Sequence, residues 1–579
     1  EETPGDAPAA DSTLPRADRS QNRLEEAHFH GDVVVDEDRF HMESQDLRLL
    51  FNMEVEQDDA LKELEAKGDV FVKGLDTNEG ELRSQHLFTE FALNAAGDSL
   101  PKRIVASDKA SIKDLTQHIR ADDHIEFHLV ESPLYPAAGD APPAEKGAFD
   151  RVQVERFRAV ENVFVELDSG VTATGDLLEG NAILGNADLT GEKVVVDGTP
   201  EDVDFHAEGT RARVERIDGR SVITIDGEGR ATLQSLGRAT PDAAASEPVD
   251  EAITDDEAHD DEANTDAPAS NAPDPETIDI TWNDEFMYME GAVQGSGTVR
   301  FRGDVHAVSI APAEENVIDA VELTAAFGDE TLDPVVDAEG TVHVETRRTL
   351  RDLIARGNAR MESRVWENSQ RDGPYRFTHI RGQYIEYNQQ TMSAKVPGAG
   401  ILLINDPRPV PEQAEGGEQA DGSLTGRGAT VFEWTDDMHM NQSAGARYDV
   451  TMIGNVIMQH DALSGDQDDA YMTCDRLDVA LSRRDADQRN PGLDFGGSTE
   501  VERFDAKGRV TLGAQSKRIE GNEVTYFERE QIVRIFGTER TDASFKSEPT
   551  RPPMRAKGFI WHLDSDDVQM TGLRSTIPR

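Results

Sequence analysis

The stretch Leu61-Lys-Glu-Leu-Glu-Ala-Lys-Gly-Asp-Val70 returns without a gap as Leu350-Arg-Asp-Leu-Ile-Ala-Arg-Gly-Asn-Ala359. A segment that recurs so far along a chain is a structural building block, so the two copies predict a repeat architecture. Each copy ends on Gly, then Asp or Asn, then an aliphatic residue. The same core also stands at Gly31-Asp32-Val33, Gly303-Asp304-Val305 and Gly454-Asn455-Val456.

This Gly-Asp/Asn-Val core predicts a tight turn or a bulge that leads into a strand. Glycine adopts positive φ freely, and Asp and Asn tolerate it better than most residues. The β-branched and alternating residues that follow suit a half-buried strand.

A second signature follows most copies, with the order apolar, any, small, polar, any, apolar, any, apolar. Its apolar residues keep a spacing of two, with one offset at the small-polar pair that predicts a bulge or a kink. The predicted repeat unit is therefore a pair of strands. Examples are Met42-Glu-Ser44-Gln45-Asp-Leu47-Arg-Leu49, Ile380-Arg-Gly382-Gln383-Tyr-Ile385-Glu-Tyr387 and Met472-Thr-Cys474-Asp475-Arg-Leu477-Asp-Val479.

Together the two signatures resemble the OstA-like repeat of the periplasmic lipopolysaccharide-transport proteins, meaning the soluble bridge proteins and the soluble part of their outer-membrane partner. The likeness is spread over Phe29 to Tyr526 and is interrupted by insertions. It implies an all-β fold in which repeated antiparallel strand pairs form an elongated, folded-over β-jellyroll, bent like a taco shell, with two or three consecutive units. In that fold, inward apolar side chains hold acyl chains.

Length and composition are consistent with a thin, extended core. The chain has 579 residues, of which 37% are hydrophobic and 6% aromatic, so it exceeds one ordinary domain and its core is lean. Acidic residues number 115 against 58 basic ones, for a net charge of −57, which disfavours a nucleic-acid partner. The single cysteine, Cys474, fills the small position of the second signature, so we expect a packed structural thiol.

Composition also predicts where the chain is divided. Stretches rich in Ala, Pro, Asp and Glu cannot bury a core, and the acidic stretch lacks the spaced Gly and closing Glu of a calcium loop. The expected parts are a disordered lead over 1–21, a first β unit over 22–237, an acidic flexible linker over 238–276, a second unit over 277–405, a loop over 406–427 and a third unit over 428–579.

Catalytic and metal-binding patterns are weak, and we expect no enzyme, no catalytic residue, no cofactor and no metal. The sequence has no Gly-Lys pair, no Gly-x-Ser-x-Gly elbow and no His-Glu-x-x-His pattern. His28, His30 and His41 are the best zinc candidates, since the first two would share a strand face. The third lies across a turn, so exposed strand histidines are the competing interpretation.

The resemblance implies an apolar groove for acyl chains, and strand alternation alone assigns its lining. The same residues would equally fill a closed core, because alternation does not show whether a sheet is open. An anionic lipid would also need cations at the groove mouth, for which Arg300, Arg302, Arg347 and Arg348 are candidates. The groove candidates are Val33, Leu47, Leu49, Val70, Leu82, Leu87, Val305, Ile385, Val456, Leu477, Val479 and Val524.

The function that the resemblance implies is non-enzymatic lipid binding and transport in the bacterial envelope. The protein would hold the acyl chains of lipopolysaccharide or a related amphiphile and pass them across the periplasm. Expected partners are that lipid and other envelope transport proteins joined by edge-strand pairing. We expect a periplasmic location, with any anchor before Glu1. The alternative is a structural or protein-interaction scaffold of the envelope, with a closed core and no lipid.

Overall fold

The computed structural model shows an all-β chain in two compact units, residues 1–168 with 172–192 and residues 169–171 with 193–579. No helix of the length and hydrophobicity needed to cross a membrane occurs in the described ranges. The residues that the structure describes are 24–37, 40–53, 60–74, 80–95, 97–114, 117–132, 151–167, 171–198, 203–218, 220–235, 277–291, 296–331, 335–336, 342–343, 346–407, 428–444, 447–462, 469–483, 499–514, 517–547 and 552–572.

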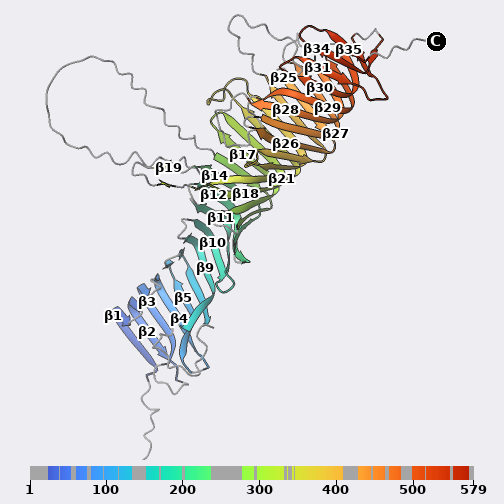
Figure 1. Cartoon of the computed structure of the whole chain (residues 1–579). Coiled ribbons are helices and arrows are strands. Elements are labelled where there is room, and N and C mark those ends of the chain that lie inside the picture. The colour runs from blue at the N-terminus through green and yellow to red at the C-terminus, as the bar shows by residue number, and fades with distance from the viewer. Residues whose placement is uncertain are drawn as a thin grey trace, which may run out of the picture. The chain divides into compact units, whose positions relative to one another are not determined.

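The first unit is an antiparallel meander, in which each strand pairs with strands that follow it closely in the chain (Figure 1). This topology needs only short connections, which suits the alternating sequence. The strands are β1 (Glu26–Glu37), β2 (Phe40–Phe51), β3 (Leu61–Gly74), β4 (Glu81–Leu93), β5 (Ser99–Ser107), β6 (Ala110–Lys113), β7 (Gln117–Ala121), β8 (His124–Glu131), β9 (Val152–Leu167) and β10 (Thr172–Asn181), while β11 (Asn186–Gly198) crosses the unit boundary.

The second unit continues in the same style. Its strands are β12 (Val203–Ile217), β13 (Arg220–Asp226), β14 (Gly229–Ser235), β15 (Thr277–Trp282), β16 (Glu285–Glu290), β17 (Gly297–Ala311), β18 (Glu314–Thr331), β19 (Val335–Val336), β20 (Val342–His343), β21 (Thr346–Val365), β22 (Arg376–Asn388), β23 (Ser393–Pro397), β24 (Gly400–Asp406), β25 (Gly428–Trp434), β26 (Asp437–Ala444), β27 (Arg447–Ala462), β28 (Ala470–Arg483), β29 (Thr499–Ala514), β30 (Lys517–Phe527), β31 (Ile532–Phe536), β32 (Ala543–Lys546), β33 (Met554–Ala556), β34 (Gly558–His562) and β35 (Val568–Thr571).

A corner interrupts the middle of many strands, and it is made by the predicted Gly-Asp/Asn core. In β17, Gly303 and Asp304 have φ of 85° and 44°, and the pairing with β18 shifts between Arg302 and Val305. Gly454 and Asn455 in β27 have φ of 89° and 41°. The turn-or-bulge prediction is thus confirmed as a bulge within one strand, which divides the strand into two arms.

At some corners the strand is broken into two shorter strands, one on each arm. We call each continuous strand a layer, and we also call each such pair of shorter strands one layer. β4 pairs with β5 along one arm and with β6 along the other, so β5 and β6 form one layer. In the second unit, four continuous layers (β17, β18, β21 and β22) precede two divided ones (β23 with β24, β25 with β26), and β27 to β34 repeat this order. The structural repeat therefore has six layers.

The two copies of the stretch that recurs in the sequence occupy the same position in this six-layer repeat. Residues 61–70 lie in β3 and residues 350–359 lie in β21. Each is the third of four continuous layers before a divided pair. Both segments are strands with a bulge, at Gly68 (φ 76°) and at Gly357 (φ 78°), as the alignment of the two copies predicts.

The sheet runs across both boundaries that composition predicts. β14 pairs with β15 from Gly229↔Trp282 to Gln234↔Thr277, so the acidic stretch is inserted between two paired strands. β24 likewise pairs with β25 across the second stretch. Residues 238–276 and 408–427 and the lead over 1–21 lie outside the described residues. The division into units at 237 and 406 stays a prediction, because a Pro- or acid-rich insertion has the same composition inside a hairpin as between domains.

Candidate functional site

Two apolar rows cross the strands of the second unit, one along each arm. They are built by direct cross-strand neighbours, whose side chains point to the same face of the sheet. We call them ladder 1 and ladder 2. Ladder 1 consists of Ala207, Ala231, Ile280, Ala307, Ile318, Met361, Ile380, Leu402, Phe432, Met458, Met472, Leu512, Ile519 and Phe545.

Ladder 2 follows the other arm in two stretches. Every member is buried, as is every member of ladder 1 except the half-buried Leu402. The first stretch is Ala212, Ile225, Phe286, Phe301, Leu323, Ala355 and Ile385. The second is Val396, Met438, Met452, Leu477, Ala506, Val524, Ile535 and Phe559.

The two arms face each other, because aromatic rings meet across the space between them. Phe205 lies on the arm of ladder 1, and its ring centroid is 6.1 Å from that of Phe286 in ladder 2. Phe545 of ladder 1 is 5.7 Å from Phe559 of ladder 2. The interior of the folded sheet is therefore an apolar space enclosed by the two arms and filled by their own side chains.

Two tryptophans of the second unit each pack over a glycine on the neighbouring strand, which the sequence alone does not reveal. A Cβ at Gly229 would lie 2.3 Å from Cζ2 of Trp282, and a Cβ at Gly400 would lie at the same distance from Cζ2 of Trp434. Each Trp pairs with that glycine across neighbouring strands. The tryptophans thus belong to a repeated Gly-Trp pair that only the strand register makes visible.

The structure buries most of the predicted groove residues and brings several of them together. Ile385, Leu477 and Val524 belong to ladder 2, and Leu47 and Leu87 belong to an equivalent row of the first unit. Three candidates, Val33, Leu49 and Leu82, are half-buried. The buried candidates are Leu47, Leu87, Val70, Val305, Ile385, Val456, Leu477, Val479 and Val524.

The equivalent row of the first unit alternates large and small side chains. Each large residue stands beside an alanine on the next strand, so the facing layers can interdigitate closely. All its members are buried. The row consists of Leu47, Ala66, Leu87, Ala106, Ile125, Ala159 and Leu178.

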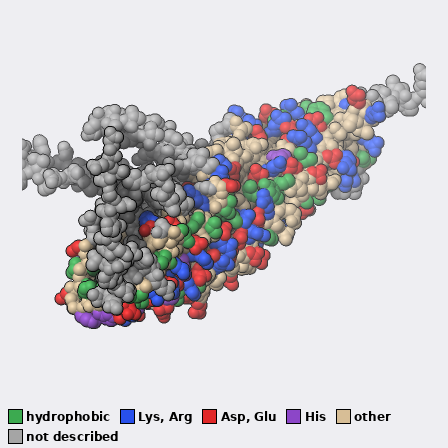
Figure 2. Space-filling view, turned by 90° about the horizontal axis from the view of Figure 1, so that it is seen from below, with side chains coloured by type: hydrophobic (Ala, Val, Ile, Leu, Met, Phe, Trp, Pro, Cys, Tyr) green, Lys and Arg blue, Asp and Glu red, His purple; other side chains and the backbone are tan. Residues whose placement is uncertain are grey.

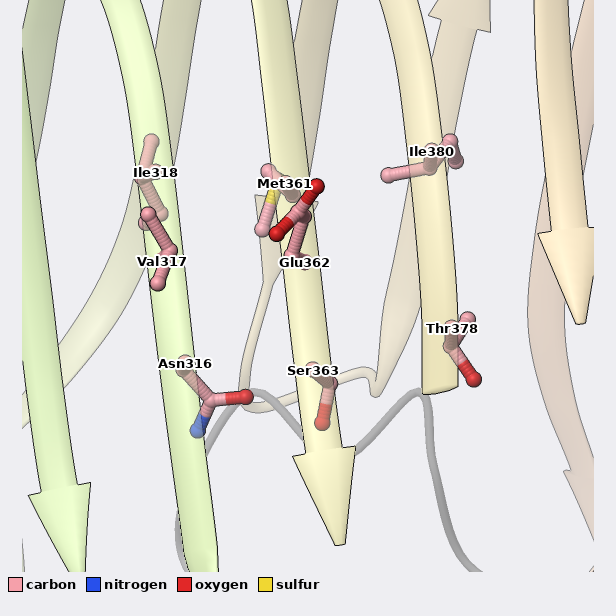
Figure 3. Close-up of a pocket in the computed structure, with 8 residues that line it drawn as sticks. All are labelled: Asn316, Val317, Ile318, Met361, Glu362, Ser363, Thr378 and Ile380. Atoms are coloured by element: carbon pink, nitrogen blue, oxygen red, sulfur yellow. The ribbon is translucent and has the colours of Figure 1, made fainter. Parts of the chain in front are cut away.

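One row next to ladder 1 is polar. Asn316 of β18 pairs with Ser363 of β21, which pairs with Thr378 of β22. Their exposed fractions are 7%, 4% and 3%. Figure 3 shows the three side chains at one level on adjacent strands, with Ile318, Met361 and Ile380 at the next level. They line a cavity of about 10 Å³, and we call the three residues the polar rung.

The outer face of the same strands carries a charged cluster around Glu362. Arg360 donates to its carboxylate, Arg364 Nη2 lies 3.2 Å from Oε2, and His379 Nδ1 lies 3.2 Å from Oε1. Burial raises the pKa of Glu362, but the hydrogen bond and the charge of Arg360 outweigh that effect, so its pKa is lowered. The cluster is satisfied by its own partners.

The histidines proposed as zinc ligands each bind a different carboxylate. His28 Nε2 lies 2.8 Å from Glu26 Oε1 and His30 Nδ1 lies 2.5 Å from Asp46 Oδ1. His41 contacts Asp36 and Glu43, whose hydrogen bonds raise its pKa, with the bond to Glu43 contributing most. In the part of the chain that is described, no three His, Cys, Asp or Glu side chains are grouped as a metal site requires.

The predicted mouth cations are engaged in ion pairs where their side chains are described. Arg300 Nη2 lies 2.7 Å from Glu285 Oε1, and Arg302 Nε lies 4.0 Å from Glu322 Oε2. The side chains of Arg347 and Arg348 lie outside the described residues. Figure 2 shows acidic and basic side chains interspersed over the visible surface, with hydrophobic side chains in small separate areas.

No protein-family model matches this sequence, and no curated protein matches it. Both ladders consist of apolar side chains throughout.

Proposed function

We propose that the protein binds and transports lipid in the bacterial envelope, without catalysis. The folded sheet would take the acyl chains of lipopolysaccharide or a related amphiphile between its two arms, as in a β-taco, and pass them across the periplasm. The observation that carries this proposal is the pair of apolar ladders, which continue from strand to strand through the second unit. Such a track offers an acyl chain apolar contact at every step.

The energetic basis is the hydrophobic effect, which contributes about 25 cal/mol for each Å² of acyl surface removed from water. The two arms contact each other through aromatic rings, so they would have to part for a lipid to enter. The two ladders contain five buried methionines, whose flexible side chains adapt to new partners and so favour such repacking. They are Met361, Met438, Met452, Met458 and Met472.

A second candidate is a scaffold of the envelope that binds other proteins and no lipid. The close packing of the interior supports it, above all the aromatic contacts of Phe205 with Phe286 and of Phe545 with Phe559. These contacts occupy the space that an acyl chain would use. The two candidates differ in whether lipid ever enters the interior.

The deciding experiment uses the full chain and a photoreactive fatty acid. After illumination, mass spectrometry should locate cross-links on ladder residues such as Leu477 and Met452, which are 0% and 1% exposed. Val321, which is 51% exposed, is the internal control and should remain unmodified. Native mass spectrometry should in addition find a co-purifying amphiphile. Cross-links confined to exposed positions, with no bound lipid, would favour the scaffold.

A further inference from the structure

The polar rung is an exception within an apolar interior, and its polar atoms lack partners. Asn316 Nδ2 donates to Glu314 Oε1 at 2.7 Å, which leaves Asn316 Oδ1 without a hydrogen bond. The hydroxyls of Ser363 and Thr378 are also unpaired. Because buried polar groups are nearly always hydrogen-bonded, three such atoms in one row indicate a missing partner.

The fold does not require the polar side chains of Asn316 and Ser363. Asn316 stands four residues before the corner residue Ala320, and Ser363 stands four residues after Ala359. Six layers further along, the same positions hold Ala470, four residues before Cys474, and Ala514, four residues after Val510. Both alanines are 4% exposed, while the position of Thr378 is held by Lys517, which pairs with Ala514. Two of the three positions therefore pack with apolar side chains elsewhere in the same chain.

The polar rung also lies at a defined depth in the interior. β18 begins at Glu314 and β22 begins at Arg376, both buried, so the outermost inward row is charged. The polar rung comes next, and the apolar row of Ile318, Met361 and Ile380 lies deeper (Figure 3). Successive rows are about 6.6–6.8 Å apart along a strand. Polarity therefore decreases stepwise from the rim inward, as it does from the head to the tail of an amphiphile.

We propose that the polar rung binds a hydroxyl or amide group carried by an acyl chain close to its head. This inference rests on the proposed function. Asn316 Oδ1 only accepts hydrogen bonds, whereas the hydroxyls of Ser363 and Thr378 both donate and accept. A hydroxyl or a secondary amide can donate to the first and accept from the others. Hydroxylated or N-linked acyl chains are thus selected over plain ones.

The test compares dodecanoic acid with 3-hydroxydodecanoic acid, which carry the same charge and chain length, by calorimetric titration of the full chain. One additional hydrogen bond should give the hydroxylated acid an affinity about tenfold higher. The triple variant Asn316→Ala, Ser363→Ala and Thr378→Val should bind both acids equally while keeping its affinity for dodecanoic acid.

A matched control is the double variant Ser44→Ala and Ser84→Ala, which removes two buried, unpaired hydroxyls from the first unit. It should keep the preference for the hydroxylated acid. Equal binding of the two acids by the natural chain, or a preference that survives the triple variant, would overturn the role of the polar rung and leave the proposed function standing. Failure of both acids to bind would overturn both proposals and leave the rung as a hydration site.

Discussion

At the scale of single residues, two corner glycines differ in the space around them: Gly303 lies within β17 and Gly398 lies between β23 and β24. Gly303 (φ 85°) and Gly398 (φ 82°) both adopt a left-handed backbone. A Cβ at Gly303 would lie 2.6 Å from the backbone nitrogen of Asp284, whereas one at Gly398 would meet nothing within 4 Å. The two positions separate backbone strain from steric conflict.

We expect Gly398→Ala to lower the free energy of unfolding by about 1–2 kcal/mol, which is the cost of a left-handed alanine. Gly303→Ala should lower the free energy of unfolding by about 1–3 kcal/mol more than Gly398→Ala does, because the neighbouring backbone must shift. Urea unfolding followed by circular dichroism measures both. Equal losses for the two variants would show that the contact at Asp284 does not matter.

Cys474 gives a second prediction at this scale. Its side chain is 3% exposed, and burial, with a smaller contribution from the charge of Asp475, raises its pKa to about 12. The thiol therefore stays protonated well above its ordinary pKa of about 8.5, and only the thiolate reacts with alkylating agents. Iodoacetamide at neutral pH should modify the unfolded chain and spare the native one. Rapid modification of the native protein would contradict this burial.

At the scale of elements, the β14–β15 hairpin tests whether the acidic stretch is a true boundary. These strands pair up to Gln234↔Thr277. Replacing the residues between Ser235 and Thr277 with about five Gly and Ser residues should therefore preserve cooperative unfolding. The free energy of unfolding should rise by about 1–2 kcal/mol, since a shorter loop costs less entropy to close.

Thermal unfolding monitored by circular dichroism measures this effect. A variant with the stretch shuffled in sequence but unchanged in length is the control, and it should unfold like the natural chain. Loss of a single cooperative transition on shortening would instead mean that the stretch separates independent parts.

The elements also show what a sequence can reveal. Strands and corners were predictable, because positive φ is a local demand that Gly303 and Asp304 meet by themselves. The offset around Ser44 and Gln45 likewise predicted the register shift between Glu43 and Asp46. The Gly-Trp pairs and the polar rung were not predictable, because they depend on which strands become neighbours. That information is distributed over distant segments.

At the scale of the whole molecule, charge repulsion should weaken the fold at low salt. The net charge of −57 arises from 115 acidic and 58 basic residues. Raising NaCl from about 0.01 M to about 1 M shortens the Debye length from about 30 Å to about 3 Å. Screening also weakens the surface ion pairs, but each of these contributes only about 0–1 kcal/mol.

We therefore expect Tm to rise with NaCl in differential scanning calorimetry. KCl at equal ionic strength is the control and should produce the same rise, since screening does not depend on the cation. A Tm that falls with salt would mean that the ion pairs outweigh the repulsion.

The meander has a consequence for how the chain is made. Each layer pairs with the layer that precedes it in the chain, so paired segments are close in sequence relative to the length of the chain and the relative contact order is low. During synthesis, each new layer can therefore pair with the preceding layer as soon as it emerges, before the C-terminus has been made. The reverse also holds: a steady pull on one end should unzip the sheet in small force steps, layer by layer.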